Sequence, residues 1–149
     1  MNAAVDNKLS PAAVIVRRTI AASAEDLFDA WLDTEALVAW MRPGSIRRTE
    51  ARVEPRVGGE YEILMHADSG VIPHRGVYRI IDRPRRLAFT WNSKFAENTL
   101  VTVDFLTRGA HTEVVITHEQ LADEERDSHN RGWTSALEKL DAFRARSGG

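Results

Sequence analysis

The sequence contains no cysteine. This absence excludes disulfide bonds, thiol catalysis and thiolate metal sites, and nothing in the fold depends on oxidising conditions. No apolar stretch approaches the length that a bilayer requires. The first eleven residues lack the basic start and the continuous apolar centre of a secretory signal. We therefore expect a cytoplasmic protein without membrane insertion.

The sequence also lacks a large excess of either charge, since 20 basic and 22 acidic side chains give a formal net charge of −2. Binding to nucleic acid needs a strong positive field, so this balance argues against a nucleic-acid partner. Between residues 47 and 56 arginines alternate with glutamates, and such mixed signs are typical of a solvated strand face rather than a phosphate-binding stripe. These residues are Arg47, Arg48, Glu50, Arg52, Glu54 and Arg56.

Familiar catalytic and cofactor-binding motifs are missing. There is no Gly-x-Ser-x-Gly elbow, no phosphate loop and no dinucleotide-binding fingerprint, and Gly58-Gly59 indicates a turn between strands. His118-Glu119 begins like a zinc-protease motif, but Ala122 stands where the second histidine is required. We therefore expect no metal and no cofactor, and no residue is identified as catalytic by motif.

The chain has the size and composition of one globular domain. Its 149 residues are 43% hydrophobic and 28% charged, which is enough to bury a core without disulfides or metal. We find no internal repeat, linker or low-complexity tract. The interpretation is a single domain over residues 1–149, in which residues 1–11 form a loose leader.

The N-terminal part predicts one strand and two short helices. A β-branched run over residues 14–20 is suited to a strand. Ser23 with Asp26 resembles a helix-capping box, and apolar residues then recur at helical spacing as far as Leu32. A second short helix, capped by Asp33 or Thr34, is expected to end before residues 43–44, which are Pro and Gly.

From there to His118 apolar and polar residues alternate, which is the period of a β-strand. Turn-forming residues divide this region into six strand-like runs, and short turns imply antiparallel neighbours. From about Ala122 the spacing becomes helical, with Trp133, Leu137 and Leu140 on one stripe. This order predicts an α+β protein in which a curved antiparallel sheet of about seven strands wraps around a long C-terminal helix.

A sheet of this width predicts a hollow beneath it. Seven strands span about 30 Å, whereas one helix with its side chains covers only about 10 to 12 Å. Bulky aromatic residues are plentiful, so a small or collapsed cavity is as well supported as a spacious one. The expected pocket lining is Trp40, Tyr61, Ile63, Met65, His74, Tyr78, Phe89, Trp91, Phe105, His118, Trp133 and Leu137.

Two histidines are in phase with the apolar face. His118 follows Val114 and Ile116 at two-residue steps, and His74 precedes Tyr78 and Ile80 in the same way. Both imidazoles and the Tyr78 hydroxyl are therefore expected to point inward, where they could orient a ligand. A structural role for each histidine is the alternative, because one register slip or bulge reverses a side chain's direction.

Taken together, the motifs along the chain resemble those of the small helix-grip proteins. This superfamily contains steroidogenic-regulatory lipid-transfer domains, birch-pollen allergens, polyketide cyclases and the activator of heat shock protein 90 ATPase, and the resemblance is greatest to single-domain bacterial homologues of the last. The segments that carry it are residues 16–20, 22–31, Trp40 with Pro43, 56–61, Gly76, 85–91, 117–121, 129–133, Leu137 and Leu140.

The resemblance implies a ligand-binding or stress-related role and no shared catalytic motif. In the eukaryotic activator a separate N-terminal domain binds the chaperone, and 149 residues leave no room for one. The expected partner is therefore a small hydrophobic molecule, and a chaperone is the weaker hypothesis. The family often has a second tryptophan where this chain has Met41 after Trp40, and this difference is expected to alter the mouth of the cavity.

Two other functions are compatible with the residues. A cyclase or dehydratase acting on an apolar carbonyl compound could use His118 or His74 as general base and Tyr78 as proton donor. Alternatively, Trp40, Met41 and neighbouring loop residues could form an exposed patch that binds a chaperone or a second copy of the chain, giving a homodimer.

Overall fold

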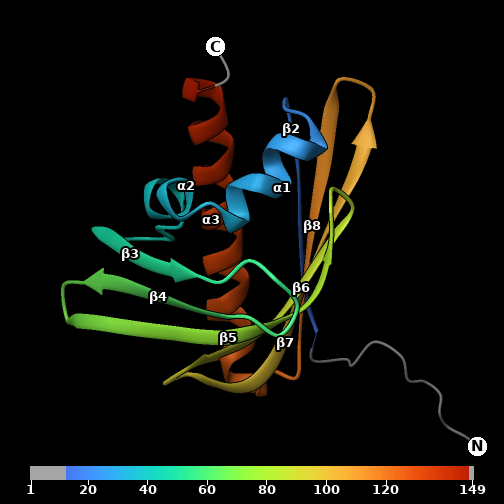
Figure 1. The fold of residues 1–149 in the computed structure, drawn as a ribbon. Helices are drawn as coiled ribbons and strands as arrows, with labels where there is room; N and C mark the ends of the chain where they lie inside the picture. The colour runs from blue at the N-terminus through green and yellow to red at the C-terminus, as the bar shows by residue number, and fades with distance from the viewer. Residues whose placement is uncertain (1–12, 148–149) are drawn as a thin grey trace, which may run out of the picture.

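The computed structural model describes residues 13–147, and the predicted leader lies outside them. Seven strands form one antiparallel sheet that wraps around a long helix (Figure 1). The strands are β2 (Val14–Ile20), β3 (Arg48–Val53), β4 (Glu60–Ala67), β5 (Gly70–Asp82), β6 (Arg86–Ser93), β7 (Ala96–Arg108) and β8 (His111–Glu119). The helices are α1 (Ala24–Leu32), α2 (Thr34–Trp40) and α3 (Arg126–Ser147), the last preceded by the 3-10 turn η1 (Asp123–Glu125).

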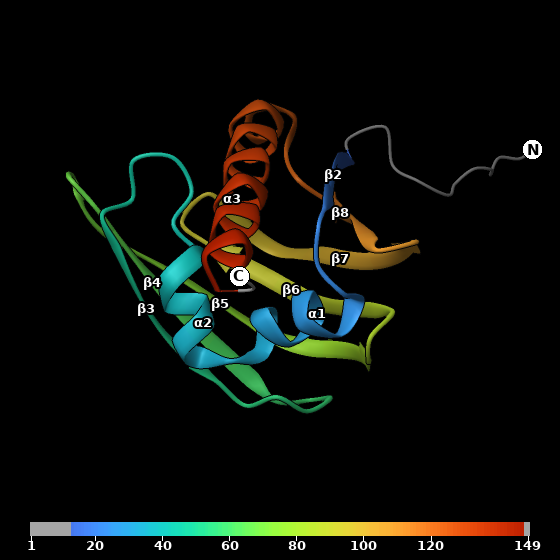
Figure 2. The same cartoon turned by 90° about the horizontal axis from the view of Figure 1, so that it is seen from above.

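The sheet order is β2-β8-β7-β6-β5-β4-β3, so β3 to β8 form a meander and β2 pairs with the last strand. The α1–α2 connection therefore joins the two edges of the sheet. Figure 2 shows α3 lying along the concave side, with α1 and α2 beside it. The predicted architecture is confirmed. Within the described residues, no helix is long and apolar enough to cross a membrane.

The two short helices begin where the capping residues predict. The Ser23 hydroxyl accepts a hydrogen bond from the Asp26 amide at 3.1 Å. The Asp33 carboxylate accepts one from the Ala36 amide at 3.0 Å, so the residue that follows α1 also caps α2. These caps satisfy amide groups that the first turn of a helix leaves without partners. They place α1 and α2 in immediate succession at one end of the sheet.

The alternating pattern correctly predicts the inner face, with one exception. Tyr61, Ile63 and Met65 are buried, as are the inward residues of β7 and β8. Ile80 was expected on the same face as Tyr78, but its side chain is 40% exposed. The pairing of β5 with β6 shifts register between these two residues, and the irregularity turns Ile80 outward.

A glycine lets one aromatic ring cross from β4 towards β6. Tyr61 lies directly opposite Gly76 on β5, and the Tyr61 hydroxyl donates a hydrogen bond to the Thr90 carbonyl on β6. A Cβ atom at Gly76 would lie 1.9 Å from that carbonyl oxygen and 2.6 Å from the Tyr61 ring. Gly76 is therefore required for the close packing of three neighbouring strands.

A buried chain of hydrogen bonds holds α3 against the sheet. The Trp133 indole N–H on α3 donates to Nδ1 of His118 on β8 at 2.9 Å. Because Nδ1 accepts, the neutral ring carries its proton on Nε2, which donates to the Thr99 hydroxyl on β7 at 2.8 Å. Thr99 in turn donates to the Trp91 carbonyl on β6 at 2.7 Å. Each donated hydrogen in this chain has one acceptor, and the arrangement requires a neutral His118.

Burial enforces this neutral state. The His118 side chain is 0% exposed, and burial lowers its pKa to about 3, with the nearby His129 adding a smaller effect. The two imidazole centroids are 5.2 Å apart. Between pH 6.5 and about 3 the unfolded chain therefore takes up a proton that the folded chain refuses, so folding becomes less favourable as the pH falls.

We expect the free energy of unfolding to decrease from pH 6.5 to 5 with a contribution from His118 that approaches about 1.4 kcal/mol per pH unit. His118→Gln removes this contribution, so the variant is less stable at neutral pH but loses stability less steeply on acidification. Urea titrations at several pH values measure the slope. His111→Gln, at an exposed position on the same strand, is the control and keeps the wild-type slope. Equal slopes in wild type and His118→Gln contradict this account.

We also expect Gly76→Ala to destabilise the fold by about 3 kcal/mol or more, because backbone has to move to admit the methyl group. Gly132→Ala on α3 is the matched control. An added Cβ there meets nothing within 4 Å, and alanine favours the helix by about 0.5 to 1 kcal/mol. Thermal and urea denaturation compare the two, and a stable Gly76→Ala protein would show that the strands separate easily.

Candidate ligand pocket at the mouth of the sheet

A pocket of about 690 Å³ opens between the N-terminal half of α3, the α2–β3 connection and the ends of β4, β5 and β6. Its lining is largely apolar. The residues are Met41, Pro43, Gly44, Ser45, Ile46, Met65, Ile72, His74, Trp91, Phe95, Ser128, His129, Arg131, Gly132, Trp133, Ser135 and Ala136. The predicted hollow between sheet and helix is thus found at the mouth of the sheet.

Deeper in the molecule, aromatic rings fill the space. An inner void of about 10 Å³ remains there, which is no larger than one water molecule. It is lined by Trp31, Leu37, Met41, Tyr61, Ile63, Tyr78, Leu87, Phe89 and Trp91. Trp31 packs against Trp40 and Trp133 with centroids 4.9 and 6.1 Å apart. For the centre of the fold, the collapsed alternative is therefore the one that the structure adopts.

The twelve residues expected to line a pocket separate into three groups. Met65, His74, Trp91 and Trp133 line the mouth pocket. Tyr61, Ile63, Tyr78 and Phe89, together with Trp91, line the inner void. The remaining four, Trp40, Phe105, His118 and Leu137, are buried in the core and line neither space.

Sequence reasoning missed the residues that loops and the start of α3 contribute. Residues 43–44 are predicted only to end α2, yet residues 43–46 all line the pocket. Phe95 lies in the β6–β7 turn with 46% of its side chain exposed. The only indication in the sequence that this turn borders the pocket is a phenylalanine in a short turn, where polar residues are usual. Gly132 on α3 leaves open space where another residue would project a side chain.

Two buried polar groups in the pocket wall have no hydrogen-bond partner in the described structure: Nδ1 of His74 and the indole N–H of Trp91. Their rings lie 4.7 Å apart. Burial lowers the pKa of His74 to about 4, so the imidazole is neutral at neutral pH. Interactions of the imidazole with the backbone of Ile63 and Ile72 oppose this effect in part, and Nδ1 remains without a hydrogen-bond partner in the described structure.

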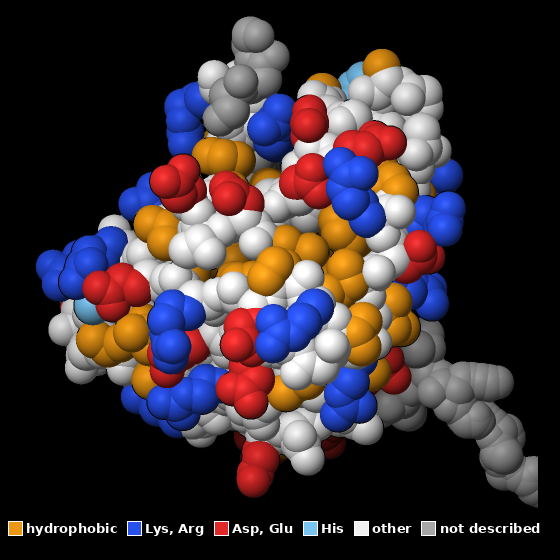
Figure 3. Space-filling model, in the orientation of Figure 1, with side chains coloured by type: hydrophobic (Ala, Val, Ile, Leu, Met, Phe, Trp, Pro, Cys, Tyr) orange, Lys and Arg blue, Asp and Glu red, His pale blue; other side chains and the backbone are white. Residues whose placement is uncertain are grey.

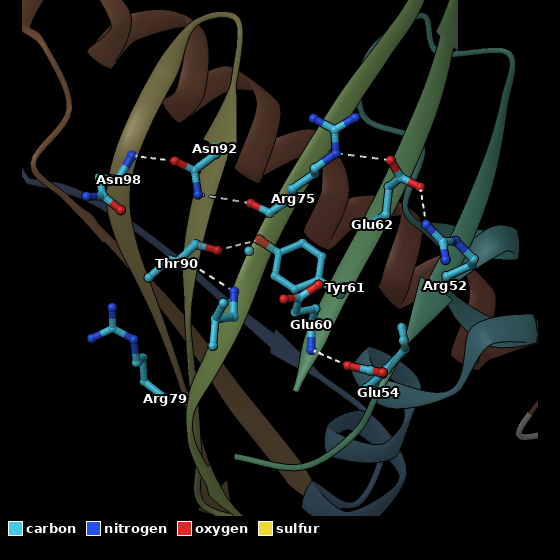
Figure 4. Close-up of a pocket in the computed structure, with 13 residues that line it drawn as sticks. Arg52, Glu54, Glu60, Tyr61, Glu62, Arg75, Arg79, Thr90, Asn92 and Asn98 are labelled. Atoms are coloured by element: carbon cyan, nitrogen blue, oxygen red, sulfur yellow. Dashed lines mark hydrogen bonds and ion pairs between the residues drawn. The ribbon is translucent and has the colours of Figure 1, made fainter. Parts of the chain in front are cut away.

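A second hollow, of about 750 Å³, lies on the outer face of the sheet and differs in character. Figure 3 shows acidic and basic side chains side by side over β3 to β5. In Figure 4 the Glu62 carboxylate bridges Arg52 and Arg75, at 2.8 and 3.1 Å. Other polar groups that line this hollow also have partners, since the Glu54 carboxylate accepts a hydrogen bond from the Glu60 amide at 2.9 Å. Many polar groups of this hollow already have partners, as predicted for a solvated face, and the mouth pocket is the better candidate site.

Burial also bears on the two alternative functions. Trp40 and Met41 are each 1% exposed, and the Trp40 indole donates to the Ala30 carbonyl at 2.9 Å. The expectation that these two side chains are exposed for docking is therefore wrong, and a docking patch there would consist of the neighbouring loop residues alone. The enzyme hypothesis named three groups, of which only His74 lines the pocket. Both nitrogens of His118 are occupied by hydrogen bonds, and Tyr78 borders the inner void.

Among the described residues, no cluster of three His, Asp or Glu could hold a metal ion.

Comparisons with known structures confirm the fold. A protein from Rhodobacter sphaeroides is 24% identical with a TM-score of 0.80, over 94% of this chain and 97% of its own. The AHSA1-like protein from Aeromonas hydrophila is 21% identical with a TM-score of 0.78, over 91% and 94%. Protein Ms6760 from Mycobacterium smegmatis is 16% identical with a TM-score of 0.81, over 97% and 98%. These likenesses concern the fold alone.

At the level of sequence, no curated protein matches the chain. The family model described as "Activator of Hsp90 ATPase homolog 1-like protein" matches residues 21–144. That span begins just after β2 and reaches the last turn of α3, so it contains every residue that lines the mouth pocket. The resemblance expected from the sequence motifs is confirmed, and the chain belongs to the Activator of Hsp90 ATPase homolog 1-like family.

Proposed function

We propose that the protein binds a small hydrophobic molecule in the mouth pocket. The observation that carries the proposal is the pocket itself, whose volume of about 690 Å³ is typical of ligand sites. Its wall combines large apolar side chains with a few polar groups, which is the usual composition of a site for a mostly apolar ligand. The filled core restricts the ligand to the mouth unless side chains move.

Flexible side chains at the base of the pocket support this function. Met41 and Met65 line it, and methionine adapts its shape to different apolar partners at low energetic cost. Met41 and Trp91 border both the pocket and the inner void, so they form the partition between the two spaces. A rotamer change of Met41 would extend the site towards the core. The protein is thus suited to ligands of more than one length.

Gly132 offers a direct test, because a side chain placed there enters the pocket without meeting other atoms within 4 Å of its Cβ. We expect wild type to bind the neutral fluorescent probe N-phenyl-1-naphthylamine saturably. Gly132→Phe fills the space and is expected to weaken this binding at least about tenfold, or about 1.4 kcal/mol. Fluorescence titration measures the dissociation constants.

Gly132→Ala is the matched control and is expected to bind within about twofold of wild type, since a methyl group leaves most of the pocket open. Glu138→Phe places the same ring on an exposed position of α3 and controls for nonspecific effects of an added aromatic group. Absence of saturable binding by wild type, or unimpaired binding by Gly132→Phe, would refute ligand binding at this pocket.

A further inference from the structure

Six buried side-chain atoms of the described residues have no hydrogen-bond partner, and three of them border the mouth pocket or the inner void. The other three, on Arg42, His66 and Arg144, line neither space. Of the four tryptophans, Trp40 and Trp133 donate their indole N–H to protein acceptors. The indoles of Trp31 and Trp91 have no partner among the described residues. Trp91 borders the mouth pocket and the inner void, whereas Trp31 borders the void alone. With His74, these residues mark a line from the mouth to the core.

Such groups are costly. A buried donor without an acceptor loses its hydrogen bond to water and gains nothing in return, so most folded proteins pair nearly all of them. Here the satisfied and unsatisfied groups lie only a few ångströms apart, since the Trp91 and Trp133 centroids are 5.0 Å apart. The packing around Trp91 is therefore compatible with a hydrogen-bonded indole, as the neighbouring Trp133 shows. The indole N–H groups of Trp31 and Trp91 are nevertheless left unpaired, although the Trp133 indole close by has an acceptor.

We propose that the ligand carries a neutral carbonyl oxygen that accepts a hydrogen bond from the Trp91 indole, with its apolar body in the mouth pocket. This inference rests on the proposed function. His74 on the pocket side and Trp31 on the core side are the neighbouring groups without partners. The inner void, about the size of one water, has room for a single oxygen atom. Met41 is the movable side chain beside it.

The chemistry of the wall selects this group. An indole N–H only donates, so its partner is an acceptor. A carboxylate at that depth would need a cation, because an unpaired buried charge is strongly unfavourable. The His74 imidazole is neutral, and the one guanidinium that lines the pocket, Arg131, is exposed at the surface. A neutral carbonyl is satisfied without any counter-ion.

Three naphthalene derivatives of nearly equal shape test the proposal. They are 2-acetylnaphthalene, the alkene 2-isopropenylnaphthalene, in which CH₂ replaces the oxygen, and 2-naphthoic acid. Isothermal titration gives the ratio of ketone to alkene affinity for each protein. Trp91→Phe keeps an aromatic ring but lacks the N–H, so the ratio is expected to fall about five- to tenfold. Trp40→Phe removes an indole that is already paired and is expected to leave the ratio unchanged.

The outcomes separate the two proposals. If neither the ketone nor the alkene binds wild type, the proposed function fails. If both bind and Trp91→Phe leaves their ratio unchanged, the carbonyl anchor is overturned and the pocket stands. Preferred binding of the acid overturns the neutral anchor. Should Trp91→Phe not fold, the infrared carbonyl stretch of ¹³C-labelled ketone bound to wild type decides: a frequency below that in cyclohexane supports the anchor, and an equal frequency overturns it.

Discussion

The placement of α3 depends on the hydrogen-bonded chain from Trp133 through His118 and Thr99 to the Trp91 carbonyl. It crosses from the helix to three adjacent strands and leaves no member unpaired, provided that His118 is neutral. Apolar packing alone would allow the helix to slide or rotate on a broad aromatic surface, because the hydrophobic effect is not directional. The chain of hydrogen bonds fixes one position, and with it two walls of the pocket.

The same helix is too narrow to cover the sheet, and the molecule resolves the mismatch in two ways. In the centre, Trp31, Phe89 and Tyr61 fill the concave face, leaving a void the size of a water molecule. Towards the N-terminal end of α3 the filling stops, because the small residues Gly44 and Gly132 face the opening. Curvature therefore yields a pocket at the mouth while the core remains well packed.

Polar groups follow the same division. Those that hold the fold together are paired, from His118 in the core to the ion pairs of Glu62 on the outer face. At the mouth pocket and the inner void, Nδ1 of His74 and the indole N–H groups of Trp91 and Trp31 have no partner among the described residues. Other lining groups are paired, such as the Ser135 hydroxyl, which accepts the Gly44 amide. Unpaired donors cost stability, and proteins tolerate that cost where a ligand compensates for it. The pocket thus combines an apolar lining with the capacity to orient one polar atom.

The elements, their order and the inner face of the sheet can be predicted from the sequence alone, because capping residues, turn residues and the two-residue alternation act locally. The sequence also placed both His74 and His118 on that face. Which imidazole is free was decided only by tertiary structure: Thr99 and Trp133, 19 and 15 residues away from His118, occupy both of its nitrogens. The register shift that exposes Ile80 and the residues that border the pocket likewise depend on how strands and α3 pack. Local patterns carry no information about such distant partners.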